Sequence, residues 1–436
     1  MSEGLVRSIR GMSDLLPPES GVFAFIESEM RRVFALYGFR EIRTPILEET
    51  TLFARAVGEE TDIVGKEMYT FTDRDGTSLT LRPEGTASAV RAYIEHGMDR
   101  NDPVARWFYT GPMFRHERPQ KGRFRQFHQI GAEVFGLQDP HIDAELIHML
   151  ASFIRELGVE GVSLRLNSLG CDKCRPAFRE ALNIFLKRVE DSLCDDCRKR
   201  MTLNPLRVLD CKKEKCISVT MDAPSATDHL CDECSSHFKG VTHVLSAFGV
   251  DWEADKRMVR GLDYYSRTTF ELLATAPGAE VGSQNAIAGG GRYDNLVEML
   301  GGRPTPAVGF AIGMERLAML LGGKAGLNDR PVKIFVMSAG SGTLSLAANL
   351  VSGLRKLNIA TEFDGSERGF KAKFKRADKS GAGFAVVIGE NEMEKSVCVV
   401  KSMSEIPLAD GKKQIEVLLN GAAEVISKML SERGNQ

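Results

Sequence analysis

The segment from Phe114 to Gly136, FRHERPQKGRFRQFHQIGAEVFG, holds the densest cluster of anion-binding groups in the sequence. Its flanks have the pattern of extended strands, and the central RPQKG has the Pro and Gly of a loop. Because guanidinium groups bind phosphate oxygens through paired hydrogen bonds, such a loop could hold a polyphosphate while Phe127 stacks on a base. A solvated basic hairpin is the alternative. Five basic residues lie within eleven positions, opposed only by Glu117: Arg115, Arg118, Lys121, Arg123 and Arg125.

Gln129 and Glu133 follow in the same segment, among the apolar residues Ile130, Val134 and Phe135. Being four positions apart, the two polar side chains share one face of a strand. A polar group in an apolar strand needs a hydrogen-bonding partner. That partner is either a polar substrate or a side chain of a neighbouring strand.

Two further segments place polar groups beside predicted strands. LRPEGT (81–86) has Glu84 and Thr86 at a strand end, where a carboxylate could hold an amino group or simply belong to a turn. RGLDYYSRTTFE (260–271) has Arg260 before a turn, with Tyr264 and Tyr265 at the start of a strand. Tyrosines there could form a pocket wall with polar tips.

The glycine-rich segments extend this set of candidates. GGGRYD (289–294) lets the backbone approach a ligand closely and places Tyr293 next, although glycine runs also occur in plain turns. VGFAIGMERLAML (308–320) predicts a glycine-broken strand entering a helix, in which Arg316 either reaches water or meets an anion. Neither GxxxxGK[ST] nor a GxGxxG between a strand and a helix is present, so a nucleotide site would be of another kind.

The elements that must position these residues follow from hydrophobic spacing. Apolar residues recur at helical spacing over 19–37, and residues 38–50 read as a short strand broken at Pro45. Strands with turn punctuation continue to residue 136, which predicts a largely antiparallel sheet without intervening helices. A helix is expected over 141–157, and another near 314–320.

Residues 167–240 differ in kind, because they hold eight of the nine cysteines together with many charges. We expect an inserted, mostly helical subdomain. Two CxxC pairs can form a tetrahedral zinc site, or the cysteines can be small buried residues between helices. Structural zinc is therefore left open, and the lone Cys398 is expected in a core. The cysteines form four pairs: Cys171/Cys174, Cys194/Cys197, Cys211/Cys216 and Cys231/Cys234.

The last quarter of the chain has its own pattern. Residues 321–331 read as a linker, and beyond it strands alternate with helices, which predicts a small α/β domain with a mixed or parallel sheet. Its segment SERGFKAKFKRADKS (366–380) has six basic residues against two acidic ones. This segment is either a local patch for nucleic acid or a solvated helix face.

Composition sets the limits. The net charge is −2 and the isoelectric point about 6.5, so the charge of the whole chain does not favour a nucleic-acid partner, which would have to be held by local basic patches. No apolar run approaches the roughly 20 residues of a membrane span, and the N-terminus lacks the apolar region of a secretory signal. We expect a cytoplasmic protein with reduced thiols and no membrane partner.

Taken in order, these segments resemble the class II aminoacyl-tRNA synthetases. The strand with Pro45, FRHERPQKGRFRQFHQ and VGFAIGMERL are similar to the three motifs of that class. RGLDYYSRTTFE and AGGGRYD (288–294) resemble segments distinctive of the bacterial histidyl-tRNA synthetase family, and LRPEGT and NPLRVLD (204–210) also fit it. The resemblance covers nearly the whole chain.

The resemblance implies an α+β fold. It places an antiparallel-sheet catalytic domain at 1–325, carrying the helical insertion at 167–240, and an α/β anticodon-binding domain at 331–436. It implies that ATP, with Mg²⁺, activates L-histidine to histidyl-adenylate and that histidine then passes to the 3′ end of tRNA(His). It also implies a homodimer formed through the first motif, and no required zinc.

The resemblance also assigns roles around ATP. Arg115 would hold the α-phosphate, and Arg260 would reach it beside the histidine carboxylate as the catalytic cation. Arg123 and Arg316 would meet the β- and γ-phosphates, and Phe127 would stack on adenine.

On the amino-acid side, the resemblance implies a pocket that binds both ends of histidine. Glu84, Thr86 and Gln129 would bind the amino and carboxylate groups. The imidazole pocket would consist of Glu133 and Tyr265, which read the ring, and of Tyr264 and Tyr293, which line it.

Three other interpretations compete with this one. A regulatory paralogue without catalysis is expected to lack RGLDYY or the C-terminal domain, and this sequence has both. A sensor of uncharged tRNA normally belongs to a longer chain with a signalling domain. A synthetase for another amino acid is disfavoured by RGLDYY and Glu133.

Overall fold

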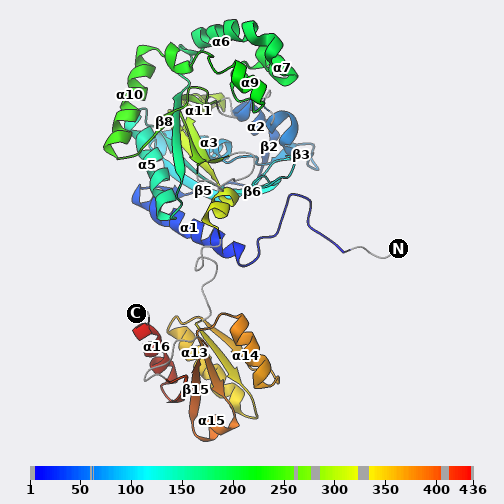
Figure 1. Cartoon of the computed structure of the whole chain (residues 1–436), viewed down its shortest axis with the longest axis vertical. Coiled ribbons are helices and arrows are strands. Elements are labelled where there is room, and N and C mark those ends of the chain that lie inside the picture. Colours follow the sequence, from blue (N-terminus) through cyan, green and yellow to red (C-terminus); the bar gives the residue numbers. More distant parts are fainter. Residues whose placement is uncertain are drawn as a thin grey trace. The chain divides into compact units, whose positions relative to one another are not determined.

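The helical spacing at the N-terminus produces helix α1 (Glu19–Leu36), which buries Ile26, Met30 and Val33 almost completely. The computed structural model describes residues 5–58, 61, 63–259, 264–275, 285–322, 333–403 and 412–433. It divides into two compact units, Met1–Asn328 and Asp329–Gln436 (Figure 1). Within the described residues, no helix is both long enough and apolar enough to cross a membrane.

The first unit is built on an eight-stranded sheet with the order β1-β5-β6-β11-β10-β9-β7-β8. All five inner pairings, from β5–β6 to β9–β7, are antiparallel, and in the described sheet only β1–β5 and β7–β8 are parallel. The predicted largely antiparallel sheet is therefore confirmed. The strands are β1 (Arg40–Glu41), β5 (Arg106–Phe114), β6 (Gln126–Phe135), β7 (Val162–Ser168), β8 (Glu253–Ala254), β9 (Ser266–Ala274), β10 (Ala286–Arg292) and β11 (Ala307–Gly313).

Four helices pack together with one face of this sheet in the largest hydrophobic core of the unit. They are α1, α5 (Pro140–Glu156), α10 (Asp232–Ala247) and α12 (Met314–Leu321) (Figure 1). The even-numbered residues of β6, Ile130, Ala132 and Val134, point into this core. Because side chains alternate along a strand, Phe127, Gln129 and Glu133 point to the opposite face.

The opposite face carries a smaller layer that the sequence did not predict correctly. Residues 38–136 include the helices α2 (Thr50–Val57) and α3 (Thr86–Glu95), so the expectation of strands without intervening helices was wrong. In α3, Ala87, Val90 and Tyr93 recur at helical spacing and are buried. The layer also contains β2 (Leu47–Glu49), β3 (Tyr69–Thr72), β4 (Ser78–Leu81), η1 (Ile63–Glu67), α4 (Met98–Asn101) and α11 (Leu296–Met299).

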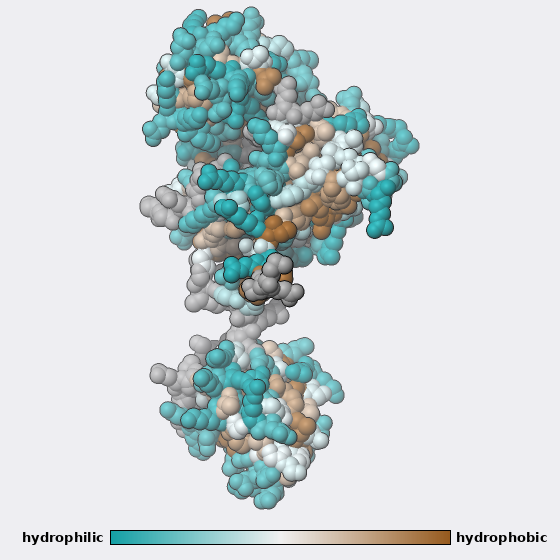
Figure 2. Space-filling model, turned by 90° about the vertical axis from the view of Figure 1, so that its right-hand side faces the viewer, coloured by the Kyte–Doolittle hydropathy of each residue, from teal (hydrophilic) through white to brown (hydrophobic). Residues whose placement is uncertain are grey.

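Apolar side chains remain exposed on this layer. Figure 2 views the side of the molecule that carries α2, β2 and β3, and pale to brown residues gather there beside a hydrophilic region. In the three-stranded sheet β2-β4-β3, Leu47 and Phe71 are 37% and 47% exposed, and Ile46, directly before β2, is 43% exposed.

The cysteine-rich segment is mostly helical, as predicted. It has a small core around Phe178, Leu182 and Leu186. Its last helix, α10, continues past the predicted end at residue 240 and packs on α5. Before α10 the elements are α6 (Arg175–Val189), η2 (Glu190–Ser192), α7 (Asp195–Leu203), α8 (Leu206–Leu209), α9 (Glu214–Val219) and η3 (Ala226–His229).

The second unit is a mixed five-stranded sheet with the order β13-β12-β14-β15-β16, as the sequence predicts. β12 pairs parallel with β13 and β14, and the other pairings are antiparallel. Cys398 is fully buried in its core, as expected. The elements are β12 (Ile334–Ser338), α13 (Thr343–Lys356), β13 (Thr361–Asp364), α14 (Phe370–Lys379), β14 (Phe384–Ile388), α15 (Glu390–Glu394), β15 (Val397–Ser402), β16 (Gln414–Leu418) and α16 (Ala422–Arg433).

The basic segment at 366–380 forms α14, but one of its six basic residues points inward. Lys373 is fully buried, and its ammonium group donates to the carbonyl oxygens of Ser338 and Ser366. Arg376 pairs with Asp364. Lys373 is therefore removed from the predicted surface patch.

A buried ion pair joins the glycine-rich strand β10 to α5. Arg292 and Asp143 are both fully buried, and Arg292 Nη2 lies 2.8 Å from Asp143 Oδ1. Arg292 also donates to Asp294 and to the carbonyl oxygen of Leu137. The sheet and the helix layer are thus fixed at this point by charge as well as by apolar contact.

We predict that Asp143→Ala lowers the stability of the first unit by about 3–5 kcal/mol, because it leaves a buried guanidinium without its main counter-ion. Urea unfolding followed by tryptophan fluorescence reports on this unit, since the two tryptophans are Trp107 and Trp252. Glu156→Ala is the control, because it removes an exposed partner of Arg32 and should cost less than about 1 kcal/mol. Equal losses in the two variants would contradict the prediction.

Candidate active site

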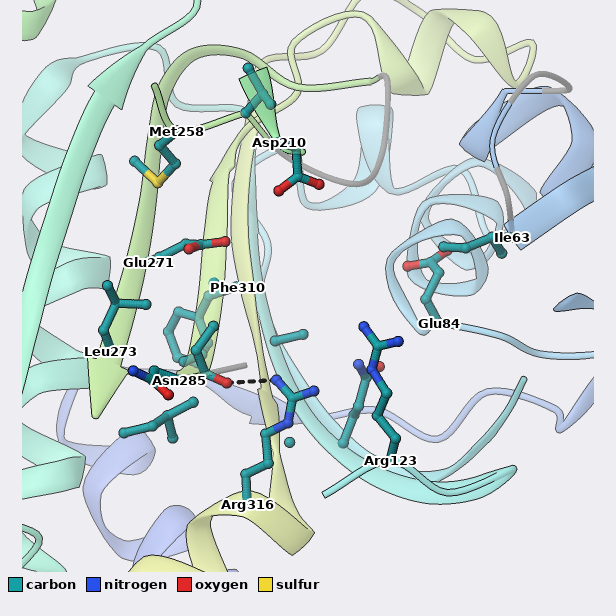
Figure 3. Close-up of a pocket in the computed structure, with 18 of the residues that line it drawn as sticks. Ile63, Glu84, Arg123, Asp210, Met258, Glu271, Leu273, Asn285, Phe310 and Arg316 are labelled. Carbon is teal, nitrogen blue, oxygen red and sulfur yellow. Dashed lines mark hydrogen bonds between the residues drawn. The ribbon is translucent and has the colours of Figure 1, made fainter. Parts of the chain in front are cut away.

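A cavity of about 760 Å³ lies on the face of the large sheet away from α1 and α5, and its size suits a ligand larger than an amino acid. In Figure 3, Glu84 and Ile63 face it from one side, Glu271 and Leu273 from the other, and Arg123 and Arg316 from below. Ten of the twelve predicted site residues line it: Glu84, Thr86, Arg115, Arg123, Phe127, Gln129, Tyr264, Tyr265, Tyr293 and Arg316. Arg260 lies outside the described residues.

Glu133 is the remaining predicted residue, and it lies behind the cavity wall, fully buried. Its carboxylate accepts hydrogen bonds from Thr86 Oγ1 at 2.8 Å, Tyr109 Oη at 2.9 Å and Tyr293 Oη at 2.5 Å. Burial raises the pKa of Glu133 to about 8, against the opposing effect of the hydroxyl donors. The sequence left open whether Glu133 meets a polar substrate or neighbouring side chains. The structure shows neighbouring side chains, and two of them, Thr86 and Tyr293, line the cavity.

Glycines make this arrangement possible. A Cβ atom at Gly309 would lie 1.6 Å from Glu133 Oε2, and Cβ atoms at Gly85 or Gly131 would lie about 2 Å from the ring of Tyr109. The register places Gly131 directly opposite Tyr109, and Gly309 opposite Glu133. The predicted glycine run, Gly289 to Gly291, lies within β10, so these glycines are part of a strand and not of a turn.

Glu84 caps the helix that presents Thr86. Its two carboxylate oxygens accept the backbone N–H groups of Thr86 at 2.6 Å and Ala87 at 2.9 Å, at the start of α3. Burial raises the pKa of Glu84, and these two amides and the charge of Arg115 oppose the rise. The carboxylate also lines the cavity, where it can accept from a ligand.

Three arginines converge on the other end of the cavity. Arg115 lies with its guanidinium carbon 5.3 Å from the centre of the Phe127 ring, and its Nε donates to the carbonyl oxygen of Pro83. Arg123 Nη1 lies 3.0 Å from Glu117 Oε2. The strand–loop–strand prediction for this segment is confirmed by β5 and β6, with a bridge between Gln120 and Arg123 in the loop.

Arg316 enters from α12 and does not reach out to solvent along the helix surface. Its Nη1 donates to the carbonyl oxygen of Ala286 at 2.6 Å, the dashed bond in Figure 3. Burial lowers the pKa of Arg316, and the charges of Arg123 and Arg115 lower it further. The strand-to-helix junction predicted for this segment is confirmed by β11 and α12.

The tyrosines form the wall between these two ends. The rings of Tyr264 and Tyr265 have centroids 4.7 Å apart, and Tyr264 lies edge-on to Tyr293 at 5.6 Å. All three are nearly buried yet line the cavity. Nearby, Gln129 Oε1 is buried and has no hydrogen-bond partner among the described residues. An amide oxygen in that position is available to a ligand.

Several residues of the site were not predicted from the sequence. Glu271 lies on β9 among apolar residues and lines the cavity, so the signal that singled out Glu133 was present here too. Tyr109 gave no such signal, because its role depends on the register of β5 with β6. The cysteine-rich segment also contributes to the wall, with Arg207, Leu209, Asp210, Cys211 and Lys212.

Comparisons with known proteins agree across the chain. A family model described as "Histidyl-tRNA synthetase" matches residues 11–172 and 199–317, and one described as "Anticodon binding domain" matches 333–429. The chain is 48% identical to a histidine–tRNA ligase of Trichlorobacter lovleyi over 94% of this chain and 95% of that protein. It is 48% identical to one of Geobacter metallireducens over 96% and 98%.

A solved structure is also similar over its whole length. The crystal structure of the apo histidyl-tRNA synthetase of S. aureus superposes with a TM-score of 0.80 at 34% identity, covering 97% of this chain and all of that one. The described fold, with its antiparallel sheet and separate C-terminal unit, is therefore shared with an experimentally determined protein.

The buried carboxylate gives a prediction about pH. Since the pKa of Glu133 is about 8 in the folded protein and ordinarily about 4.5, the folded state binds more protons between these values. The stability that protonated Glu133 contributes to the fold is present below about pH 4.5 and is lost as the pH rises through about 8. On going from pH 5 to pH 8, the melting temperature of the wild type should fall by a few degrees more than that of Glu133→Gln, which has no group to titrate there.

The measurement is thermal unfolding followed by tryptophan fluorescence at both pH values. Other titrating groups are the same in the two proteins, so their effects cancel in the comparison. Parallel pH profiles would contradict the raised pKa of Glu133.

Proposed function

The chain belongs to the histidyl-tRNA synthetase family, and from that membership we propose how its cavity carries out the reaction of an ATP-dependent histidine–tRNA ligase. Such an enzyme activates histidine with ATP and then joins it to tRNA(His). The convergence of Arg115, Arg123 and Arg316 on one end of the cavity carries the proposal. Burial, and after it the charges of Arg123 and Arg115, lower the pKa of Arg316, and a polyanion such as a triphosphate would compensate these clustered positive charges.

We assign the ATP contacts from the positions of these side chains. Arg115 and Phe127 lie together on one wall, which suits an α-phosphate next to a stacked adenine. Arg123 and Arg316 lie further along and suit the β- and γ-phosphates. Guanidinium groups fixed before the reaction stabilise the charge that develops on the phosphate oxygens as pyrophosphate leaves.

Magnesium fits the same cavity because the carboxylate of Glu271 faces it (Figure 3). When bound with ATP, the ion would neutralise phosphate charge. Arg260, four positions before Tyr264 in the sequence, is proposed as the cation that joins the histidine carboxylate to the α-phosphate. The carboxylate of histidine is already a nucleophile, so its attack on the α-phosphorus requires no general base.

We propose that histidine binds between Glu84 and the tyrosines. The Glu84 carboxylate and the hydroxyl of Thr86 receive the ammonium group, while the side-chain amide of Gln129 positions the main-chain end of the amino acid. A bound ammonium group also compensates the burial that raises the pKa of Glu84.

The imidazole is read at the buried carboxylate of Glu133. The hydroxyl groups of Thr86 and Tyr293 donate hydrogen bonds to Glu133, so the lone pairs of these oxygens remain free to accept a hydrogen bond from a ring N–H. Tyr265 meets the second ring nitrogen, and Tyr264 completes the wall. A side chain without two ring nitrogens would leave buried polar groups unpaired, which is a strong basis for rejection.

The second unit is proposed to bind the anticodon stem of tRNA(His), since it corresponds to the anticodon-binding family model. The exposed basic residues of the predicted patch supply positive charge for the phosphate backbone. They are Arg368, Lys371, Lys375, Arg376 and Lys379.

We retain the proposed domain bounds of 1–325, with the insertion at 167–240, and 331–436. A cytoplasmic location follows from the need for tRNA and ATP.

A homodimer is proposed through the first class II motif, around Pro45. The supporting observation is that the exposed apolar residues Ile46, Leu47 and Phe71 lie in or directly beside the three-stranded sheet, where a second copy of the chain would cover them. We predict that the double variant Ile46→Glu/Leu47→Glu sediments as a monomer where the wild type sediments as a dimer. The control is Leu203→Glu, an exposed leucine of the insertion. A wild-type monomer at micromolar concentration would contradict the dimer.

The proposed reaction is tested by exchange of pyrophosphate into ATP, with each of the twenty amino acids supplied separately. We predict exchange with histidine alone, because only imidazole satisfies both the Glu133 network and Tyr265. Exchange with a different amino acid would contradict the specificity. Folded protein that exchanges with none would move the assignment to a regulatory paralogue.

The role of the arginines is tested in the same assay. We predict that Arg123→Ala and Arg316→Ala each lower kcat/KM for ATP by about 10- to 100-fold, the equivalent of one charge-assisted contact. Arg118→Ala is the matched control, since this arginine lies in the same loop, is exposed and does not line the cavity. A loss in the control as large as that in Arg316→Ala would show that loop charge matters and position does not.

A further inference from the structure

The eight cysteines of the insertion gather in two groups of four. Cys171 and Cys174 meet Cys231 and Cys234 in the first group, which joins the two ends of the segment. The second group lies between them in the sequence and consists of Cys194, Cys197, Cys211 and Cys216. Within each group all the Sγ atoms lie within 4.8 Å of one another. The pairing is therefore nested: the two outer CxxC motifs meet each other, and the two inner cysteine pairs meet each other.

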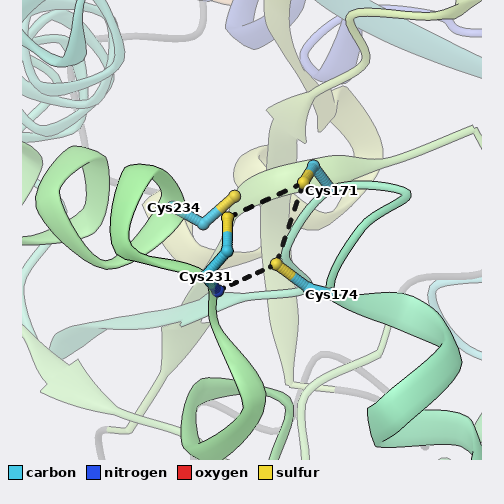
Figure 4. Close-up of side chains that lie close together, drawn as sticks. All are labelled: Cys171, Cys174, Cys231 and Cys234. Atoms are coloured by element: carbon cyan, nitrogen blue, oxygen red, sulfur yellow. Dashed lines mark hydrogen bonds between the residues drawn. The ribbon is translucent and has the colours of Figure 1, made fainter.

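The spacing of the sulfur atoms is that of ligands around a metal ion. Cys171 Sγ lies 3.8 Å from Cys174 Sγ and 4.0 Å from Cys231 Sγ (Figure 4). Four sulfurs placed tetrahedrally about 2.3 Å from a zinc ion lie about 3.8 Å from each other. Disulfide sulfurs would be about 2.0 Å apart, and all eight of these cysteines are free.

Ordinary packing of small buried residues does not explain this arrangement. Cys171, Cys194 and Cys231 are only half-buried, so they are not there to fill a core. Cys194 and Cys231 immediately precede α7 and α10, where the helix N-terminus favours a thiolate. Their backbone N–H groups each donate to a sulfur of their own group, Cys194 to Cys216 and Cys231 to Cys174, both at 3.2 Å. Such donors are typical of the surroundings of metal thiolates.

We propose that each group binds one Zn²⁺ ion as a structural site. Four thiolates close the coordination shell and leave no open position for a substrate, so neither ion takes part in the reaction directly. Soft sulfur ligands in a tetrahedral set favour zinc over the magnesium that accompanies ATP.

The first site closes the insertion at its base. It binds the loop that follows β7 to the start of α10, which are some 60 residues apart in the sequence. Gly170, in this loop, lies close to the first cysteine group, since a Cβ atom there would lie 2.5 Å from Cys174 Cβ. Arg267 of β9 forms an ion pair with Glu233 of α10 at 2.6 Å, which connects the region of the first cysteine group to the large sheet.

The second site positions a wall of the active-site cavity. Cys211 itself lines that cavity, together with Asp210 and Lys212 on either side of it. Arg257 joins the same region to the strand side of the cavity, because it donates to the carbonyl oxygens of Leu209 and Thr220. The core of the insertion is small, and a small core usually needs a metal or a covalent link for stability.

The test is the metal content of the full-length chain, produced without a histidine tag and measured by plasma mass spectrometry. We expect two zinc ions per chain. Cys171→Ser and Cys194→Ser are chosen because these residues are half-buried, and each should leave one zinc. The double variant should leave none. Cys398→Ser is the control, since this cysteine belongs to neither group and should leave two.

A second measurement does not depend on the folding of variants. Titration of the wild type with a mercurial should release one zinc for every four thiols modified, detected with a chromogenic chelator. Folded wild-type protein with less than one zinc per chain would overturn the proposal. One zinc ion per chain would overturn the proposal for the cysteine group whose serine variant loses no metal. Iron in place of zinc would overturn the identity of the ion.

Discussion

The burial of one carboxylate, that of Glu133, organises the active site. An ionisable group without solvent must receive hydrogen bonds, and here the donors come from three separate elements: Thr86 at the start of α3, Tyr109 on β5 and Tyr293 after β10. Gly309 leaves the space that the carboxylate occupies. A single constraint therefore fixes the relative positions of four segments, and two of the same hydroxyl groups, those of Thr86 and Tyr293, belong to residues that line the cavity.

The opposite end of the cavity is arranged differently from the surroundings of Glu133. There the protein brings like charges together, and burial with neighbouring arginines lowers the pKa of Arg316. This arrangement is unfavourable without a ligand and favourable with a polyphosphate, so stability is given up where binding is gained. In the proposed reaction the two ends would bind an amino acid and a nucleotide next to each other, as carboxylate attack on an α-phosphate requires.

The insertion connects stability with this geometry. Its inner cysteine group contributes Cys211 to the cavity wall, and Arg257 ties the neighbouring backbone to the sheet side. The outer group closes the base of the insertion onto β7 and α10. Whatever holds these thiols together therefore also determines the shape of the cavity on that side.

The sequence by itself determined the features that depend on local pattern. The helices α1 and α5, the antiparallel sheet, the mixed sheet of the second unit and the basic loop all follow from periodicity and turn residues, which act over a few positions. Only the tertiary structure decided which groups meet. Tyr109 faces Glu133 because of strand register, Arg292 finds Asp143 across two layers, and each cysteine pair has its partner pair by nesting. Spacing along a chain cannot specify such contacts, because they join residues that chain folding alone brings together.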